Sequence, residues 1–183
     1  IKKKENKKDK PFRLKYIEAG RLATPELSTE QAFKEIIHFA HISRNGLGYA
    51  RAAINESNTE KFEELRGKLV KYEEISDRIE FEIATYITEI SKNEISEEAT
   101  KTIKSIYKII KEMESLGDSG ESIGRILKRK NAHGKAFDKS LLDRLTKMMD
   151  LVQKGYDTMV ANLKNPDLKD ISNAINAEDN SNE

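Results

Sequence analysis

The sequence predicts an all-α protein, an antiparallel bundle of long helices, and three observations support this. Apolar residues recur at steps of three and four along four long stretches, which is the spacing of one helix face. The 183 residues include only nine glycines and three prolines, too few for the frequent turns of an all-β domain. The 33 basic and 32 acidic side chains nearly balance, so charge repulsion does not keep the chain unfolded.

Several kinds of site are excluded by the residue types that the sequence lacks. Without cysteine there is no disulfide, no thiolate zinc site and no cysteine nucleophile. No apolar run approaches the ~18 residues that a membrane-spanning helix needs. Neither a glycine-rich phosphate loop nor a Gly-x-Ser-x-Gly elbow is present. His38, His41 and His133 do not complete a metal-ligand set, and we expect them in packing or surface roles. The sequence therefore favours a domain that is not an enzyme.

The first helix is predicted over residues 29–56. Ser28-Thr29-Glu30-Gln31 has the form of a capping box, which predicts that regular structure begins here. A seven-residue apolar repeat follows, formed by Phe33, Ala40, Leu47 and Ile54. Asn45-Gly46 often marks a turn, but the apolar phase continues through it, so we expect one helix.

Three more helices are predicted after short loops. The second spans residues 59–92, the third begins after Ser96 and runs to a loop at 131–135, and the fourth ends before Pro166. Small residues interrupt the apolar stripes of the second and third helices at Ser76, Gly117 and Gly120. The stripe of the fourth helix comprises Leu141, Leu142, Leu145, Met148, Met149, Val152, Tyr156, Met159 and Leu163. Long helices with short connections run antiparallel in order to bury such stripes.

Charge is concentrated at the two ends of the chain. Residues 1–16 carry eight basic and two acidic side chains, and residues 166–183 carry one basic and five acidic side chains. We divide the chain into a basic leader or juxtamembrane linker (1–27), a helical bundle (28–165) and an acidic, partly disordered tail (166–183). The leader is either a flexible linker or a segment that lies on an anionic membrane surface. Nucleic acid is not an expected partner, because the bundle has no excess of positive charge to extend the contact.

Two acidic triplets share the pattern Glu-x-x-x-Asp-x-x-Glu. They are Glu73, Asp77 and Glu80 in the second helix and Glu114, Asp118 and Glu121 in the third. Each triplet lies on one helix face, one residue after the core stripe. Like charges at this spacing destabilise a helix by about 0.2–0.5 kcal/mol per pair, and a bound hard cation would offset that cost. The alternative is that the acids are solvated or paired with bases such as Lys111 and Arg125. Neither triplet contains the Glu-x-x-His pattern of a di-iron bundle.

Parts of these helices resemble PhoU domains. The run from Glu73 to Glu80 is similar to the second-helix signature of that family. Met113–Asp118, followed by Ile123, is similar to the third-helix signature, although Ser115 stands where the family usually has arginine. Pro11–Tyr16 and Thr24–Ser28 resemble the junction that follows the membrane domain of bacterial sodium/phosphate cotransporters. A full PhoU domain has two three-helix repeats, so the resemblance implies one repeat plus the first helix of a second.

The resemblance also implies a function and a site. It implies the soluble regulatory domain of a sodium-dependent phosphate cotransporter, on the cytoplasmic side of the plasma membrane. The first residue, Ile1, favours a segment of a longer protein. Expected partners are the membrane transport domain of the same parent chain and, through the leader, an anionic membrane surface. A homodimer is a further possible assembly. The implied metal ligands are Glu73, Asp77, Glu114 and Asp118, for iron or other transition-metal ions. The alternatives are a free-standing PhoU-type phosphate-signalling regulator and a purely structural helical interaction module.

Overall fold

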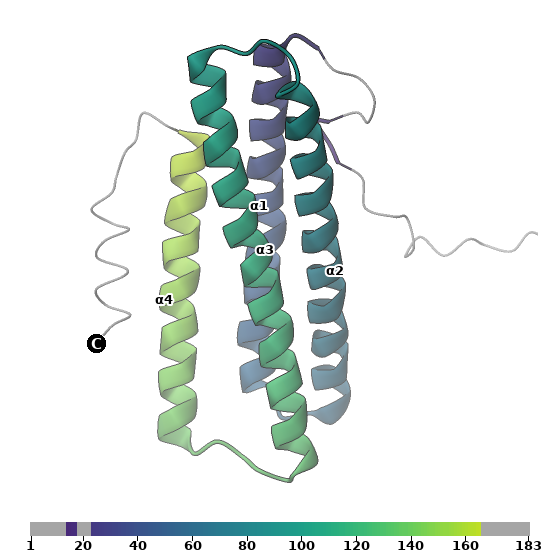
Figure 1. Cartoon of the computed structure of the whole chain (residues 1–183). Helices are drawn as coiled ribbons and strands as arrows, with labels where there is room; N and C mark the ends of the chain where they lie inside the picture. The colour runs from purple at the N-terminus through teal and green to yellow at the C-terminus, as the bar shows by residue number, and fades with distance from the viewer. Residues whose placement is uncertain (1–13, 18–22, 166–183) are drawn as a thin grey trace, which may run out of the picture.

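Four long helices make up the protein in the computed structural model, which describes residues 14–17 and 23–165 (Figure 1). They are α1 (Pro25–Asn55), α2 (Thr59–Ile90), α3 (Glu97–Ala132) and α4 (Lys139–Lys164). The α2–α3 turn lies at one end of the bundle, and the α1–α2 and α3–α4 turns lie at the other. Within the described ranges there is no strand, and no helix is both long and apolar enough to cross a membrane. The predicted all-α antiparallel bundle is confirmed. The predicted acidic tail and most of the basic leader lie outside the described residues.

Each helix begins at a polar side chain that accepts a hydrogen bond from a backbone amide of the first turn. These N-cap residues are Thr24, Asn58, Ser96 and Asp138. The prediction that the first helix begins at Thr29, with Ser28 as the cap, is wrong, because α1 begins at Pro25. Pro25 takes the first helical turn, where its missing N–H is not needed. Ser28 is buried inside that turn, and its Oγ accepts from the Ala23 amide at 3.1 Å.

The helix α1 is central to the packing. Of the described helices, it alone contacts the three others, and α4 packs its backbone along α1 only. Buried side chains form two clusters, one that includes Phe39, Ile83 and Ile106 and a second that includes Ala53, Phe62 and Leu127. All four helices contribute buried residues to both clusters, so the core is continuous along the bundle.

Asn45-Gly46 continues the helix as predicted, and the glycine has a packing reason. A Cβ on Gly46 would lie 3.0 Å from Cδ1 of Tyr72 on α2. The Tyr72 ring also lies edge-on to Tyr49, with 5.5 Å between the ring centroids. The helix tolerates the propensity cost of glycine, about 1 kcal/mol relative to alanine, because the ring from α2 occupies the space that a side chain would need.

The helices α2 and α3 approach each other closely where both carry small residues. A Cβ on Gly117 would lie 3.0 Å from Oγ and 3.1 Å from Cβ of Ser76, which is 1% exposed. This level lies between the two core clusters, since Met113 belongs to the first and Leu69 to the second. The expectation that Ser76 and Gly117 permit close backbone approach is confirmed.

Two ion pairs join α4 to α1. Arg44 pairs with Asp157, and Arg51 with Asp150, each guanidinium donating through Nε and Nη2 to both carboxylate oxygens. The pairs are seven residues apart on both helices, as expected for antiparallel neighbours.

The prediction that Met148 and Val152 belong to a buried stripe is wrong: they are 45% and 37% exposed. The reason is that α4 has a single neighbouring helix, which covers only part of its apolar face.

Replacing Gly117 with alanine should lower the free energy of unfolding by about 1–3 kcal/mol, because the added methyl group forces Ser76 or a helix to shift. Gly67 is the matched control, since an added Cβ there meets nothing within 4 Å. Gly67→Ala should raise the free energy of unfolding by about 0.5–1 kcal/mol through helix propensity. Urea denaturation followed by circular dichroism measures both. Equal gains from the two substitutions would contradict the tight α2–α3 contact.

The α1–α4 ion pairs should contribute a salt-dependent coupling. In a double-mutant cycle, Arg44→Ala and Asp157→Ala should show a favourable coupling energy at low salt that shrinks at about 1 M salt, where the screening length is about 3 Å. Arg51→Ala with Asp157→Ala is the control cycle, because these two residues are not paired with each other. A coupling energy that is equal in both cycles would rule out the observed pairing.

Candidate metal centre

Three of the four predicted ligands come together between α2 and α3. Glu73 and Asp77 are one turn apart on α2, and Asp118 faces them from α3. One carboxylate oxygen of each lies within 4.8 Å of the other two. Oxygens that bind one cation at about 2.0–2.6 Å must lie within about 5 Å of one another. The three carboxylates therefore fit a single cation with little rearrangement.

The fourth predicted ligand, Glu114, lies outside this group of three. It is one turn before Asp118 on α3 and is half-buried. Its electrostatic neighbours are Asp118, Glu80 and Asp77. The acidic residues thus form a continuous antiparallel strip along the edge of the α2–α3 contact, and Glu114 extends that strip beyond the group of three.

The strip is electrostatically strained. Burial raises the pKa of the Glu73 carboxyl group, and the nearby Asp77, Asp118, Glu121 and Glu74 raise it further. Burial likewise raises the pKa of Glu114, with Asp118, Glu80 and Asp77 adding to the effect. Both carboxyl groups hold their protons more tightly than in water, because each loses hydration and gains negative neighbours.

Basic side chains neutralise only part of this strip. Arg125 pairs with Glu121 at 2.7 Å, as the alternative interpretation expected. Between described residues, however, no ion pair involves Glu73, Asp77, Glu114 or Asp118, and Lys111 does not pair with Glu114. The four predicted ligands, together with Glu80, are therefore the triplet acids that no described basic side chain neutralises. A set of carboxylate oxygens suits hard cations such as Mn²⁺, Mg²⁺ and Ca²⁺, and carboxylates in helical bundles also hold iron.

The histidines do not add ligands to this strip. His38 Nδ1 hydrogen-bonds Glu35 Oε1 at 2.8 Å, and no histidine belongs to the group formed by Glu73, Asp77 and Asp118. Burial lowers the pKa of His41, and Lys164, His38 and Arg44 lower it further. These positive neighbours disfavour a metal ion beside His41. The expectation that both histidines have packing or surface roles agrees with these contacts.

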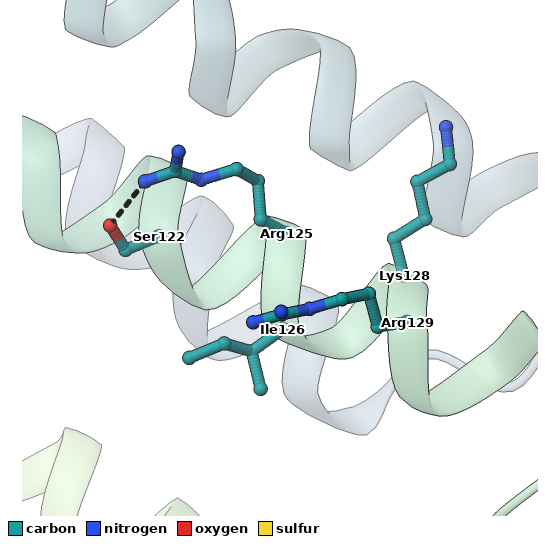
Figure 2. A pocket seen from close by; sticks show the side chains of 5 residues that line it. All are labelled: Ser122, Arg125, Ile126, Lys128 and Arg129. Carbon is teal, nitrogen blue, oxygen red and sulfur yellow. Dashed lines mark hydrogen bonds between the residues drawn. The ribbon is translucent and has the colours of Figure 1, made fainter. Parts of the chain in front are cut away.

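A shallow groove of about 530 Å³ lies farther along α3, lined by Ser122, Arg125, Ile126, Lys128 and Arg129 (Figure 2). Arg125 Nη2 donates to Ser122 Oγ at 2.9 Å, and the side chains of Arg125, Lys128 and Arg129 extend from the helix surface. All five lining residues come from one helix. Since no second helix contributes a wall, the groove is a basic surface feature and not a built binding site.

In metal-free protein, Asp118→Asn should raise the free energy of unfolding near neutral pH and lower the pKa of Glu73 and Glu114. A carboxyl group whose pKa rises on folding destabilises the folded state while ionised. That penalty is present above the raised folded pKa and disappears as the pH falls through it to below about pH 4. The stability gain of the variant should therefore vanish in acid. Denaturation in chelator over a pH series, with NMR titration of the two glutamates, measures it. A variant that is less stable near neutral pH would contradict this repulsion.

The comparisons with known proteins support a family. The PhoU domain model matches residues 36–127, half of the 183 residues. The comparisons with curated proteins and with solved structures found no match. The matched range holds most of α1, all of α2 and α3 as far as Leu127, and therefore includes the acidic strip. The match and the all-α bundle agree with the resemblance noted in the sequence. The chain belongs to the PhoU domain family.

Proposed function

We propose that this chain is the regulatory PhoU domain of a sodium-dependent phosphate cotransporter, attached to a preceding membrane transport domain on the cytoplasmic side. The family match supports a regulatory role in phosphate homeostasis, because PhoU domains are regulatory domains. The cotransporter context is the finer part of the proposal. In that context the basic leader lies against the anionic membrane surface between the two domains.

The observation that carries the cotransporter context is the junction before the bundle. Residues of this junction have defined structural roles: Thr24 caps α1, Pro25 begins it, and Ile17 is buried in the first core cluster. What supports the cotransporter context is the resemblance of Pro11–Tyr16 and Thr24–Ser28 to the junction of sodium/phosphate cotransporters. The family match starts at Ile36 and does not include the junction, so a free-standing PhoU-type regulator is the alternative.

Sodium-dependent phosphate uptake tests the proposal in cells that make the full parent protein. The reading frame upstream of Ile1 should encode several membrane-spanning segments. Removal of the bundle should change uptake or its response to external phosphate, while the membrane domain still reaches the membrane. An upstream frame without membrane spans would favour the free-standing regulator. Unchanged uptake and unchanged response would favour a purely structural module.

The second part of the proposal is a cation site formed by Glu73, Asp77 and Asp118, with Glu114 as the nearest further carboxylate. Iron or another transition-metal ion would supply the positive charge that the strip lacks. The residues contribute three oxygen donors that two helices hold within 4.8 Å of one another. Their mutual repulsion in the absence of a cation favours binding, because a cation removes it.

Added Mn²⁺ or Fe²⁺ should raise the melting temperature, because an ion that binds only the folded state stabilises it. At an ion concentration of a hundred times the dissociation constant, the free energy of unfolding should rise by about 2.7 kcal/mol. Asp118→Asn should lose this response. Glu112→Gln is the matched control: it removes one negative charge from an exposed position on the same helix and should keep the response. No response of the wild-type protein to these ions, to Mg²⁺ or to Ca²⁺ would rule out the site. An equal loss in both variants would indicate non-specific charge binding.

A further inference from the structure

A fully buried carboxylate on α1 has a role that neither the acidic strip nor the family match explains. Glu35 is 0% exposed. Its Oε2 accepts hydrogen bonds from the backbone amides of Lys15 at 2.8 Å and Tyr16 at 2.7 Å. Its Oε1 lies 2.8 Å from Nδ1 of His38, one turn further along α1. Glutamate is rarely buried unless its charge is compensated, and here two amides and an imidazole compensate it.

The segment that Glu35 holds is Leu14–Ile17, which we call the strap. It precedes α1 and belongs to no helix. Ile17 is 7% exposed within the first core cluster, and Leu14 packs against that cluster. The Tyr16 ring lies edge-on to His38 with 6.3 Å between centroids, and Lys15 Nζ lies 5.1 Å from the centre of the Tyr16 ring. The strap therefore covers part of the apolar core and is fastened to α1 at one polar point.

The strap and the bundle differ in what holds them. The helices α1, α2 and α3 share a core that contains fully buried Ile36, Phe39, Ile83 and Ile106. The strap adds Ile17 and Leu14 to this core, and the amides of Lys15 and Tyr16 bond to Glu35 instead of to a helix. Segments with few buried apolar contacts open locally more often than the core. The strap is thus the part that can detach while the helices stay folded.

We propose that Leu14–Ile17 is a releasable strap and that the carboxylate of Glu35 is its latch. When the latch is closed, Leu14–Ile17 is held against α1, the helix that contacts the three other described helices. When it opens, these four residues leave the bundle and part of the first core cluster becomes exposed. The strap is a two-state connection between the bundle and whatever precedes it. This inference does not depend on the cotransporter context.

Amide hydrogen exchange of the full chain, followed by NMR, tests the strap. In the wild-type protein, the Lys15 and Tyr16 amides should be protected, yet should exchange faster than the amides of Phe39 and Ile83 in the core. Glu35→Gln preserves the size of the side chain and removes its charge, so the hydrogen bonds to the two amides weaken. It should speed exchange at Lys15 and Tyr16 by about tenfold and leave the core amides unchanged.

Two further variants separate release of the strap from general destabilisation. Ile36→Val, next to Glu35 and fully buried, is the matched control: it should speed exchange in the core and leave the two strap amides unchanged. His38→Ala removes the partner of Oε1 and should speed strap exchange without affecting the core, which keeps the test open if Glu35→Gln does not fold. Strap amides that exchange as in an unfolded peptide would overturn the latch. Strap and core amides that accelerate equally in both Glu35→Gln and His38→Ala would overturn independent release.

Discussion

The burial of α1 among its neighbours is the constraint on which the rest of the structure depends. A helix surrounded in this way needs apolar or small residues on most of its circumference, and Ala32, Ile36, Phe39, Ala40 and Ala50 are 0% exposed. The few polar side chains on its inner and flanking faces must then find partners. Glu35 accepts hydrogen bonds from the strap, and Arg44 and Arg51 form ion pairs with α4. The central helix is therefore also the attachment point for the elements outside the α1–α2–α3 core.

The acidic strip follows from a different feature, the narrow level between the two core clusters. Ser76 and Gly117 let α2 and α3 approach, so side chains one residue further along each helix meet at the edge of the contact. Asp77 and Asp118 occupy those positions and Glu73 lies one turn before Asp77, so close approach of the backbones brings like charges together. A bundle built this way is less stable without a cation than it would be with neutral side chains there. An ion that bridges two helices would make the stability of this edge depend on ion concentration, which suits a regulatory domain.

Helix starts and helix lengths could be predicted, because they depend on hydrogen bonds within one turn and on the spacing of apolar residues, which are local in the sequence. The capping pattern at Ser96 and the apolar stripes of α2 and α3 predicted helices with nearly the observed bounds. The rotational register also predicted that Glu73, Asp77 and Asp118 share an edge. The axial offset that separates Glu114 from the group of three could not be predicted, because it depends on how far α3 slides along α2.

What the sequence by itself determined is the number of helices, their approximate bounds and the faces that carry acids or apolar side chains. Tertiary structure decided the rest, through contacts between residues far apart in the chain. Ser28 has the pattern of a cap, but its burial beside Ala23 leaves that role to Thr24. Gly46 lies inside α1, and the Tyr72 ring from α2 occupies the space that a side chain at position 46 would need. Glu35 lies four residues before Phe39, on the same buried face of α1, and a charged residue on an apolar face is unusual. Its partners at Lys15 and Tyr16 are 20 and 19 residues away, and only the folded chain brings them within hydrogen-bond distance.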